Sequence, residues 1–213
     1  LLLELTGFYR DEPRDDRVYR TAFDFDGWPP PMEVSSRQSG IELSAYVQRP
    51  TGRYARLQAT LSRASEIDVW IHPAALQLPP RWMASPWDAG HDVGLTVGRE
   101  RRRSAERITG WSAQWTWRGG WQEPVLLEEP SRDTNTSVYS MLERTSLGDF
   151  MRIDVRWYRT KLIGPHLRTW SLDMQNLTAR QNVAFQRWDD VAREVETIYQ
   201  LGLIPILTYR RTF

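Results

Sequence analysis

The chain has no cysteine and only three histidines among its 213 residues. Without cysteine there is no disulfide, no thiolate metal ligand and no cysteine nucleophile. The histidines, His72, His91 and His166, show neither the His-x-His nor the His-x-x-x-His spacing of metal ligands. We therefore expect no metal site and no cofactor.

Other signatures of chemistry are also missing. The sequence contains no Gly-x-Ser-x-Gly nucleophile turn, no Ser-x-x-Lys pair and no glycine-rich phosphate loop. No segment approaches the roughly 18 consecutive apolar residues of a membrane-spanning helix, so we expect no membrane span in these residues. The net charge of +1 gives no global field that would attract nucleic acid or an anionic membrane, although it allows a local patch.

Lysine is nearly absent, since Lys161 is the only lysine among 28 basic residues. The planar fork of arginine suits phosphate, carboxylate and aromatic rings. The arginines are nevertheless spread along the chain, which favours a compositional origin over a nucleic-acid footprint. The exception is a run in which Arg99, Arg101, Arg102 and Arg103 form a candidate phosphate-binding patch. The alternative for this run is a solvated charged loop.

Tryptophan is abundant, with 11 residues. In the segment 111–117, Trp111, Trp115 and Trp117 occupy odd positions and polar residues occupy the even ones. Strict alternation predicts a strand with one buried face and one wet face. The sequence therefore predicts a β-rich domain with a heavy aromatic core.

Similar segments follow one another along the chain. Arg49–Gly52 and Ser146–Gly148 are predicted hairpin turns, and Pro205 would place the last strand at a sheet edge. The first five residues suffice for another edge strand. The candidate strands are 1–9, 17–25, 41–48, 56–62, 67–71, 93–97, 107–118, 136–144, 149–159, 167–174 and 204–209.

One segment, at about 178–201, has helical periodicity, with Asn176 or Thr178 as its cap and Gly202 at its end. Its apolar residues, at steps of three and four, are Ala184, Trp188, Val191, Val195 and Ile198. The predicted fold is thus mainly β (α+β): an antiparallel β-sandwich or open barrel with one C-terminal amphipathic helix packed on a sheet. We expect a single domain over 1–213, with a long loop rich in proline and tryptophan at about 73–98.

Several carboxylates and aromatic residues are candidate site residues. Asp24 and Asp26 lie on one face of a strand end, where they could bind a cation or divide acid and base roles; a simple strand end is the alternative. Asp154 resembles part of the acid–lysine pattern of metal-dependent nucleases, although an exposed charge pair explains it more simply. Trp82 and Trp87, in the long loop, are candidate binding residues.

These observations favour a non-enzymatic structural or assembly subunit of a virion, a phage particle or another multi-protein complex. Many strands, a long loop and surface aromatics occur here without an active-site motif. One alternative is a carbohydrate- or nucleic-acid-binding module that uses tryptophan and arginine. Another is a metal-dependent hydrolase or nuclease that uses Asp24, Asp26 or Asp154. The expected partners are proteins or copies of the chain, with nucleic acid at the arginine patch as an alternative.

Overall fold

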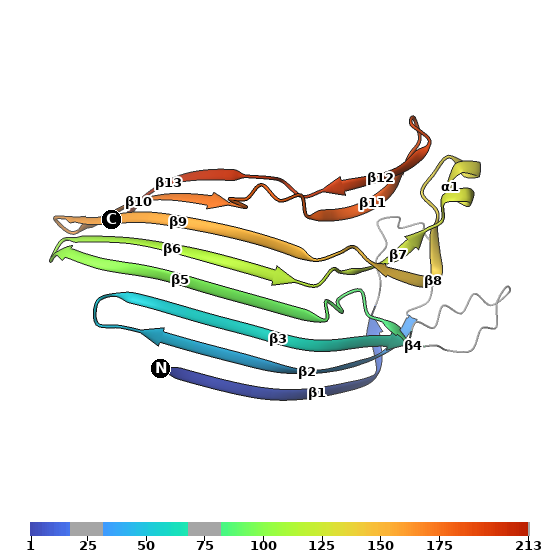
Figure 1. Cartoon of the computed structure of the whole chain (residues 1–213), viewed down its shortest axis with the longest axis horizontal. Coiled ribbons are helices and arrows are strands. Elements are labelled where there is room, and N and C mark those ends of the chain that lie inside the picture. Colours follow the sequence, from blue (N-terminus) through green and yellow to red (C-terminus); the bar gives the residue numbers. More distant parts are fainter. Residues whose placement is uncertain (18–31, 68–81, 213) are drawn as a thin grey trace.

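The computed structural model describes residues 1–17, 32–67 and 82–212. One antiparallel sheet of nine strands dominates the molecule (Figure 1). Short β4 (Trp82–Ala84) pairs with β3 beside the main path. In spatial order the path is β1 (Leu2–Arg17), β2 (Met32–Gln48), β3 (Arg53–Ile67), β5 (His91–Ser104), β6 (Arg107–Arg118), β9 (Phe150–Ile163), β10 (His166–Gln175) and β13 (Ile204–Thr212).

The pairing register sorts the side chains onto two different faces. Residues paired across strands point to the same side, so the row from Leu57 through Leu95 and Trp115 to Ile153 shares one face. We call this the apolar face; it carries the odd-numbered residues of the strands, except on β4 and β10, where it carries the even-numbered ones. The opposite, polar face carries mainly hydroxyl, amide and charged side chains. Strand β6 spans the predicted residues 107–118.

The prediction of a heavy aromatic core is wrong. Trp188, 5% exposed, is the only buried large hydrophobic side chain among the described residues, whereas Trp111 and Trp157 remain 46% and 47% exposed. The described part contains neither a second sheet packed face to face nor a closed barrel, so no other described sheet covers the apolar face. The chain exposes 15680 Å², whereas a compact monomer of 25.0 kDa exposes about 10,000 Å².

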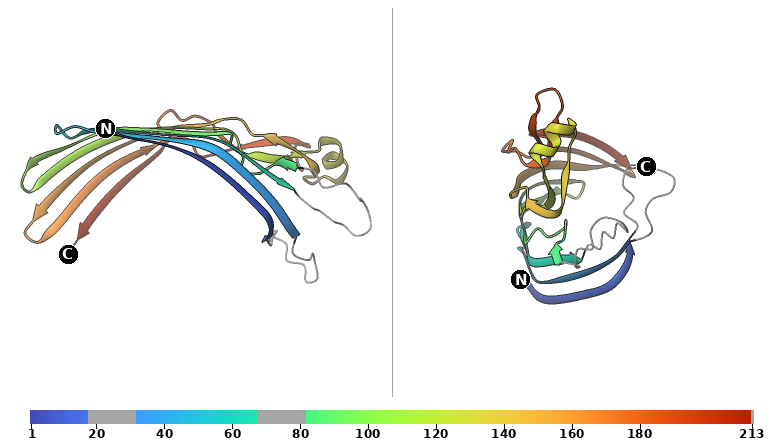
Figure 2. Two further views of the ribbon diagram at one scale, coloured as in Figure 1. Left: turned by 90° about the horizontal axis from the view of Figure 1, so that it is seen from below. Right: turned by 90° about the vertical axis from the view of Figure 1, so that its right-hand side faces the viewer.

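Three aromatic rings of the polar face lie over glycines of the neighbouring strands. Phe8 is paired with Gly40, and Tyr54 with Gly98, where an added Cβ would come within 2.6 and 2.5 Å of the rings. Tyr158 covers Gly110 in the same way. A ring can fold flat over a glycine because no side chain opposes it, and glycine positions also let a sheet bend. Figure 2 shows the bent shape of the sheet.

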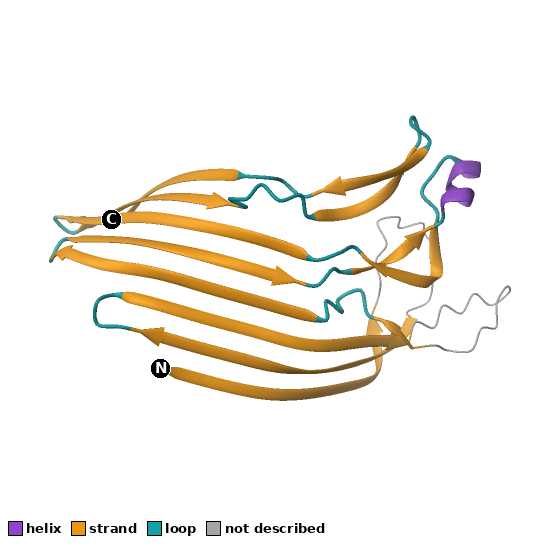
Figure 3. Cartoon of the chain, viewed as in Figure 1, coloured by secondary structure: helices purple, strands orange, loops and turns teal. Residues whose placement is uncertain are grey.

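A smaller region lies at one end of the sheet (Figure 3). It contains two ribbons and the single helix of the described residues, whereas the strands of the main sheet extend away from it. Its elements are β7 (Gln122–Leu126), α1 (Glu128–Thr134), β8 (Tyr139–Ser146), β11 (Val183–Asp189) and β12 (Glu194–Tyr199). We call this region the packed corner.

The predicted helix at 178–201 is wrong, because these residues form the β11–β12 hairpin and the helix α1 lies in mid-chain. The hairpin pairs Trp188 with Val195 and brings Phe185 opposite Ile198. Its strands are rich in β-branched and aromatic residues, which favour a sheet over a helix. The apolar residues at steps of three and four in the sequence belong to two different strands, β11 and β12, which a short turn joins. No helix is therefore present for Asn176 to cap.

The other turns divide into confirmed and corrected predictions. Arg49–Gly52 joins β2 to β3, with Gly52 at φ 76°. Ser146–Gly148 does not join a hairpin, because β8 pairs with β7 and β9 pairs with β6 and β10. Pro205 lies in edge strand β13, as predicted, and β1 forms the other edge. Within the described ranges no helix has the length and apolarity needed to cross a membrane.

Candidate functional site

The polar face carries an open cleft of about 670 Å³. Its floor comes from β3, β5, β6 and β9, and its wall comes from the loops around Gly120 and Gly148 and from the start of β11. Polar side chains of the floor include Gln58, Thr60, Asp92, Gln114, Thr116, Arg118 and Arg152. The floor of the cleft therefore presents hydrogen-bonding side chains to water.

Three ion pairs lie in or beside this cleft. Arg118 contacts Asp92 at 2.7 Å between β5 and β6. Arg152 contacts Asp154 at 2.9 Å within β9, and Arg156 contacts Asp173 at 3.3 Å between β9 and β10. Asp154 also accepts a hydrogen bond from the backbone N–H of Asn176, at 2.9 Å. The carboxylates thus hold strands and a loop together, which explains their positions without catalysis.

No group of three or more His, Asp or Glu residues in the described ranges could hold a metal ion. Among the predicted catalytic residues, Asp154 is engaged as above, while Asp24 and Asp26 lie outside the described residues. The polar face does contain one strongly perturbed group. Burial raises the pKa of the Tyr158 phenol far above its ordinary value, and the hydrogen bond it donates to Glu100 raises the pKa further. Tyr158 therefore remains a protonated donor.

The apolar face is the larger feature. In the three central rows of β1 to β9, every side chain is apolar, and large members such as Leu3, Leu5 and Leu95 are 65%, 71% and 37% exposed. The three rows comprise Leu3, Leu5, Val47, Ala45, Leu43, Ala55, Leu57, Ala59, Val97, Leu95, Val93, Ala113, Trp115, Trp117, Val155, Ile153 and Met151. Six strands about 4.8 Å apart make this a band roughly 25 Å wide.

A row of basic residues lies near one end of the same face. Arg107 is paired with Lys161, Lys161 with Arg168, and Arg168 with Arg211, so four cations lie side by side on β6, β9, β10 and β13. We call them the basic row. Like charges directly opposite one another destabilise a sheet. Arg107, Lys161 and Arg168 form no ion pair with a described residue, and Arg168 Nε is buried without a hydrogen bond.

Aromatic rings occupy the level between the basic row and the aliphatic rows. Trp170 and Tyr209 are paired on β10 and β13, with ring centroids 4.7 Å apart. Trp111 and Trp157 are paired one row further in, on β6 and β9. The same two rows also contain Arg159, paired with Trp170, and Arg99, paired with Trp111. Along the strands, the apolar face thus passes from cations through a mixed level of aromatic rings and arginines to aliphatic side chains.

The structure divides the predicted binding residues between two distant places. Arg99 and Arg101 lie on the apolar face near the β5–β6 turn, Arg102 lies on the polar face and donates to the Ala105 carbonyl at 3.2 Å, and Arg103 lies in the bulge between them. Arg99 is level with one end of β3, whereas Trp82 pairs with the other end. The arginines and tryptophans therefore form no common site.

The two predicted tryptophans have local partners of their own. Arg37 lies over the Trp82 ring, with its guanidinium 4.3 Å from the ring centroid. Trp87 is 65% exposed and meets Trp121 edge to face, with centroids 5.4 Å apart. These two rings, with Phe185 and other residues, line an open hollow of about 450 Å³.

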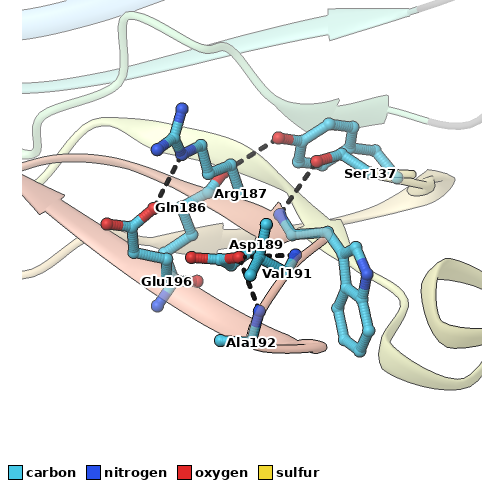
Figure 4. A network of polar contacts seen from close by, with 9 residues as sticks. Ser137, Gln186, Arg187, Asp189, Val191, Ala192 and Glu196 are labelled. Atoms are coloured by element: carbon cyan, nitrogen blue, oxygen red, sulfur yellow. Dashed lines mark hydrogen bonds and ion pairs between the residues drawn. The ribbon is translucent and has the colours of Figure 1, made fainter. Parts of the chain in front are cut away.

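Figure 4 shows the polar contacts of the packed corner. The Trp188 backbone N–H donates to Ser137 Oγ at 2.9 Å, and its indole N–H donates to Asn135 Oδ1 at 3.2 Å. Asp189 Oδ1 accepts backbone hydrogen bonds from Val191 and Ala192, both at 2.8 Å, which lowers the pKa of the Asp189 carboxyl. These contacts stabilise the hairpin turn and form no open site.

Sequence reasoning missed the basic row. Lys161, Arg168 and Arg211 lie on three different strands and are not clustered in the sequence. Only the cross-strand register brings them together; within each strand, the signal is a cation two or four residues from an aromatic residue of the same face. No family model, curated protein or solved structure matches this chain.

Proposed function

We propose that the chain is a non-enzymatic structural subunit of a larger multi-protein assembly, in which strands of neighbouring copies extend its sheet. The observation that carries this proposal is the pair of open edges. Strands β1 and β13 each pair with only one neighbour among the described residues, so each leaves a row of backbone groups without a strand partner. Such an edge is a ready template for another strand.

The residues of these edges support the same conclusion. Leu3 and Leu5 on β1 are 65% and 71% exposed, and Leu207 on β13 is 70% exposed. Monomeric proteins protect a sheet edge with charge, short length or a cover. The apolar ends of β1 and β13 lack such inward-facing charge, and β1 is 16 residues long.

The direction of the edges allows copies to join. The path without β4 contains eight strands, each antiparallel to the next, so β1 and β13 run in opposite directions. The β13 edge of one copy can therefore pair antiparallel with the β1 edge of the next. Such a head-to-tail contact generates a ring if its rotation closes and a filament if it does not.

Cysteine cross-linking tests this arrangement, because the chain has no cysteine of its own. One cysteine replaces Leu3 or Leu5 on β1, and a second replaces Leu207 or Tyr209 on β13, so that several registers are sampled. A disulfide forms only where the two Cα atoms lie about 4.4–6.8 Å apart. The matched control combines the same β1 cysteine with Ala113→Cys on interior strand β6.

We expect covalent oligomers from at least one combination of edge cysteines and none from the control. A cross-linked monomer would show that the sheet closes within one chain and would overturn assembly through copies. Failure of every edge combination in a folded protein of monomeric mass would overturn it as well.

A further inference from the structure

On the apolar face, side chains of one kind form rows that run across the strands, so the distance along one strand measures the height of the apolar band. On β3 this face has no charged side chain between Arg53 and Arg63, a distance of roughly 33 Å at about 3.3 Å per residue. The apolar band of a membrane-embedded sheet is about 25 Å tall, and the hydrocarbon layer of a bilayer is about 30 Å thick. At a strand tilt of about 40° the uncharged stretch spans roughly 25 Å along the membrane normal, which matches the height of that apolar band.

The aromatic level is in the position that a bilayer interface favours. Trp170, Tyr209, Trp111 and Trp157 lie between the basic row and the aliphatic rows and are 46–48% exposed. Tryptophan and tyrosine prefer the level of the lipid headgroups, because their rings are apolar on one side and carry a hydrogen-bonding group on the other. Arg159 and Arg99 lie at the same level, where a long cationic side chain can also reach the headgroups. The order from cations, through rings mixed with arginines, to aliphatic side chains follows the polarity of a membrane leaflet.

The interior of the band argues against a protein as its cover. A protein–protein interface carries about one hydrogen bond per 100–200 Å² and has a polar rim. The three central rows instead contain no hydroxyl, amide or charged group across six strands, roughly 25 Å of sheet width, and they continue to the open edge at β1. A partner without polar groups and without a fixed outline fits such a surface.

We infer that the apolar face lies against the hydrocarbon chains of a lipid bilayer, with the strands running into the membrane, and that the basic row binds anionic headgroups. The polar face and its cleft then face water. Phosphate-bearing headgroups would relieve the repulsion among Arg107, Lys161, Arg168 and Arg211. The inference rests on the proposed assembly, because the edges β1 and β13 cannot remain unpaired in hydrocarbon.

Nitroxide labels along β9 test the contact with hydrocarbon. Seven variants each carry one cysteine at a position from Met151 to Trp157, and the labelled protein is reconstituted into vesicles of phosphatidylcholine and phosphatidylglycerol. Oxygen concentrates in hydrocarbon, whereas a charged nickel chelate stays in water. We expect oxygen collisions to peak at positions 151, 153, 155 and 157 and nickel collisions to peak at 152, 154 and 156.

Two results would overturn the lipid contact. If neither probe reaches the odd positions, a protein covers the apolar face. If the nickel chelate reaches the odd positions as readily as the even ones, the face lies in water.

A charge-matched pair of variants tests the headgroup site. The first carries Arg107→Gln, Lys161→Gln and Arg168→Gln, all in the basic row. The control carries Arg56→Gln, Arg102→Gln and Arg210→Gln, which remove the same charge from the polar face. We expect flotation with phosphatidylglycerol vesicles to show on the order of 100-fold weaker binding for the first variant and a much smaller loss for the control. Equal losses would overturn the headgroup site.

The assembly and the lipid contact can fail separately. In one case, oxygen collisions peak at the odd positions while no oligomer forms through the cysteines of β1 and β13. That result would overturn assembly through copies and retain the lipid contact. In the opposite case, disulfide-linked oligomers form, but neither oxygen nor the nickel chelate reaches the odd positions of β9. That result would support assembly through copies and overturn the lipid contact.

Discussion

The packed corner and the nine-stranded sheet differ in how they satisfy their apolar side chains. In the packed corner, Trp188 is buried and both its backbone and indole N–H groups have partners within the chain. In the sheet, Trp111 occupies an equally regular strand and remains 46% exposed. The packed corner buries its tryptophan within one chain, whereas the main sheet is a single layer in the described residues and its apolar face is exposed.

This difference shows that alternation alone does not build a core. Alternating side chains sort themselves between two faces because of strand geometry, whatever lies beyond each face. Burial requires a second layer, which the packed corner obtains by folding α1, β8 and β11 together. The main sheet has no such layer in the described ranges.

The largest expected effect comes from truncating one tryptophan in each region. Trp188→Ala should lower the free energy of unfolding by about 3–5 kcal/mol, because it empties a packed site. Trp111→Ala should lower it by less than about 1 kcal/mol in detergent solution, because half of that side chain contacts no protein. Urea unfolding measures both values. Equal losses would contradict the distinction between the two regions.

The next effect tests the polar face of the sheet. Gly110→Ala should cost about 1–3 kcal/mol, because its new methyl group would displace the Tyr158 ring. The control is Gly94→Ala on the same face, where nothing lies within 4 Å of the new atom. Thermal unfolding of the two variants provides the comparison, and a control that is as unstable as Gly110→Ala would contradict the ring-over-glycine explanation.

A smaller effect is expected for the ion pairs of the cleft. Arg118 and Asp92 are in contact at 2.7 Å, but their side chains are 38% and 42% exposed. Solvent screens such a pair, so the coupling energy in a double-mutant cycle of Arg118→Gln and Asp92→Asn should not exceed about 1 kcal/mol. A coupling above about 2 kcal/mol would indicate that the polar face is shielded from water.

The smallest effect concerns pH and the turn between β11 and β12. The pKa of Asp189 is lowered in the folded protein, chiefly by the backbone hydrogen bonds from Ala192 and Val191. The ionised carboxylate therefore stabilises the turn above the ordinary pKa of an aspartate, and this contribution disappears as the pH falls through the folded-state pKa. Asp189→Ala should be less stable than the parent at neutral pH and equal to it in strong acid. Acid unfolding followed by circular dichroism measures the difference, and a constant gap at all pH values would contradict this role.

Much of the main sheet could be predicted from local pattern. The predicted strand 107–118 matches β6, and the edge position of Pro205 follows from its missing amide. The hairpin β11–β12 could not be recognised in this way, because apolar spacing was the same for a helix and for two strands folded across a turn. Tertiary pairing, which puts Trp188 opposite Val195, decided between them.

The candidate surfaces depended on information that a local pattern does not contain. A search for uninterrupted apolar runs cannot detect an apolar face built from alternating strands, because every second residue belongs to the other face. The basic row needs the register of β6, β9, β10 and β13, which aligns residues from Arg107 to Arg211. The predicted arginine run lies beside this row but contains no member of it.

Quenching of tryptophan fluorescence by brominated acyl chains reports whether the apolar face contacts lipid. Besides Trp82 on short β4, five indoles of the described residues lie on the apolar face, those of Trp111, Trp115, Trp117, Trp157 and Trp170. In vesicles, brominated lipid should quench the parent strongly, and replacing these five residues with phenylalanine should remove most of that quenching. If the parent is not quenched, or if the five replacements leave the quenching unchanged, the apolar face does not contact lipid.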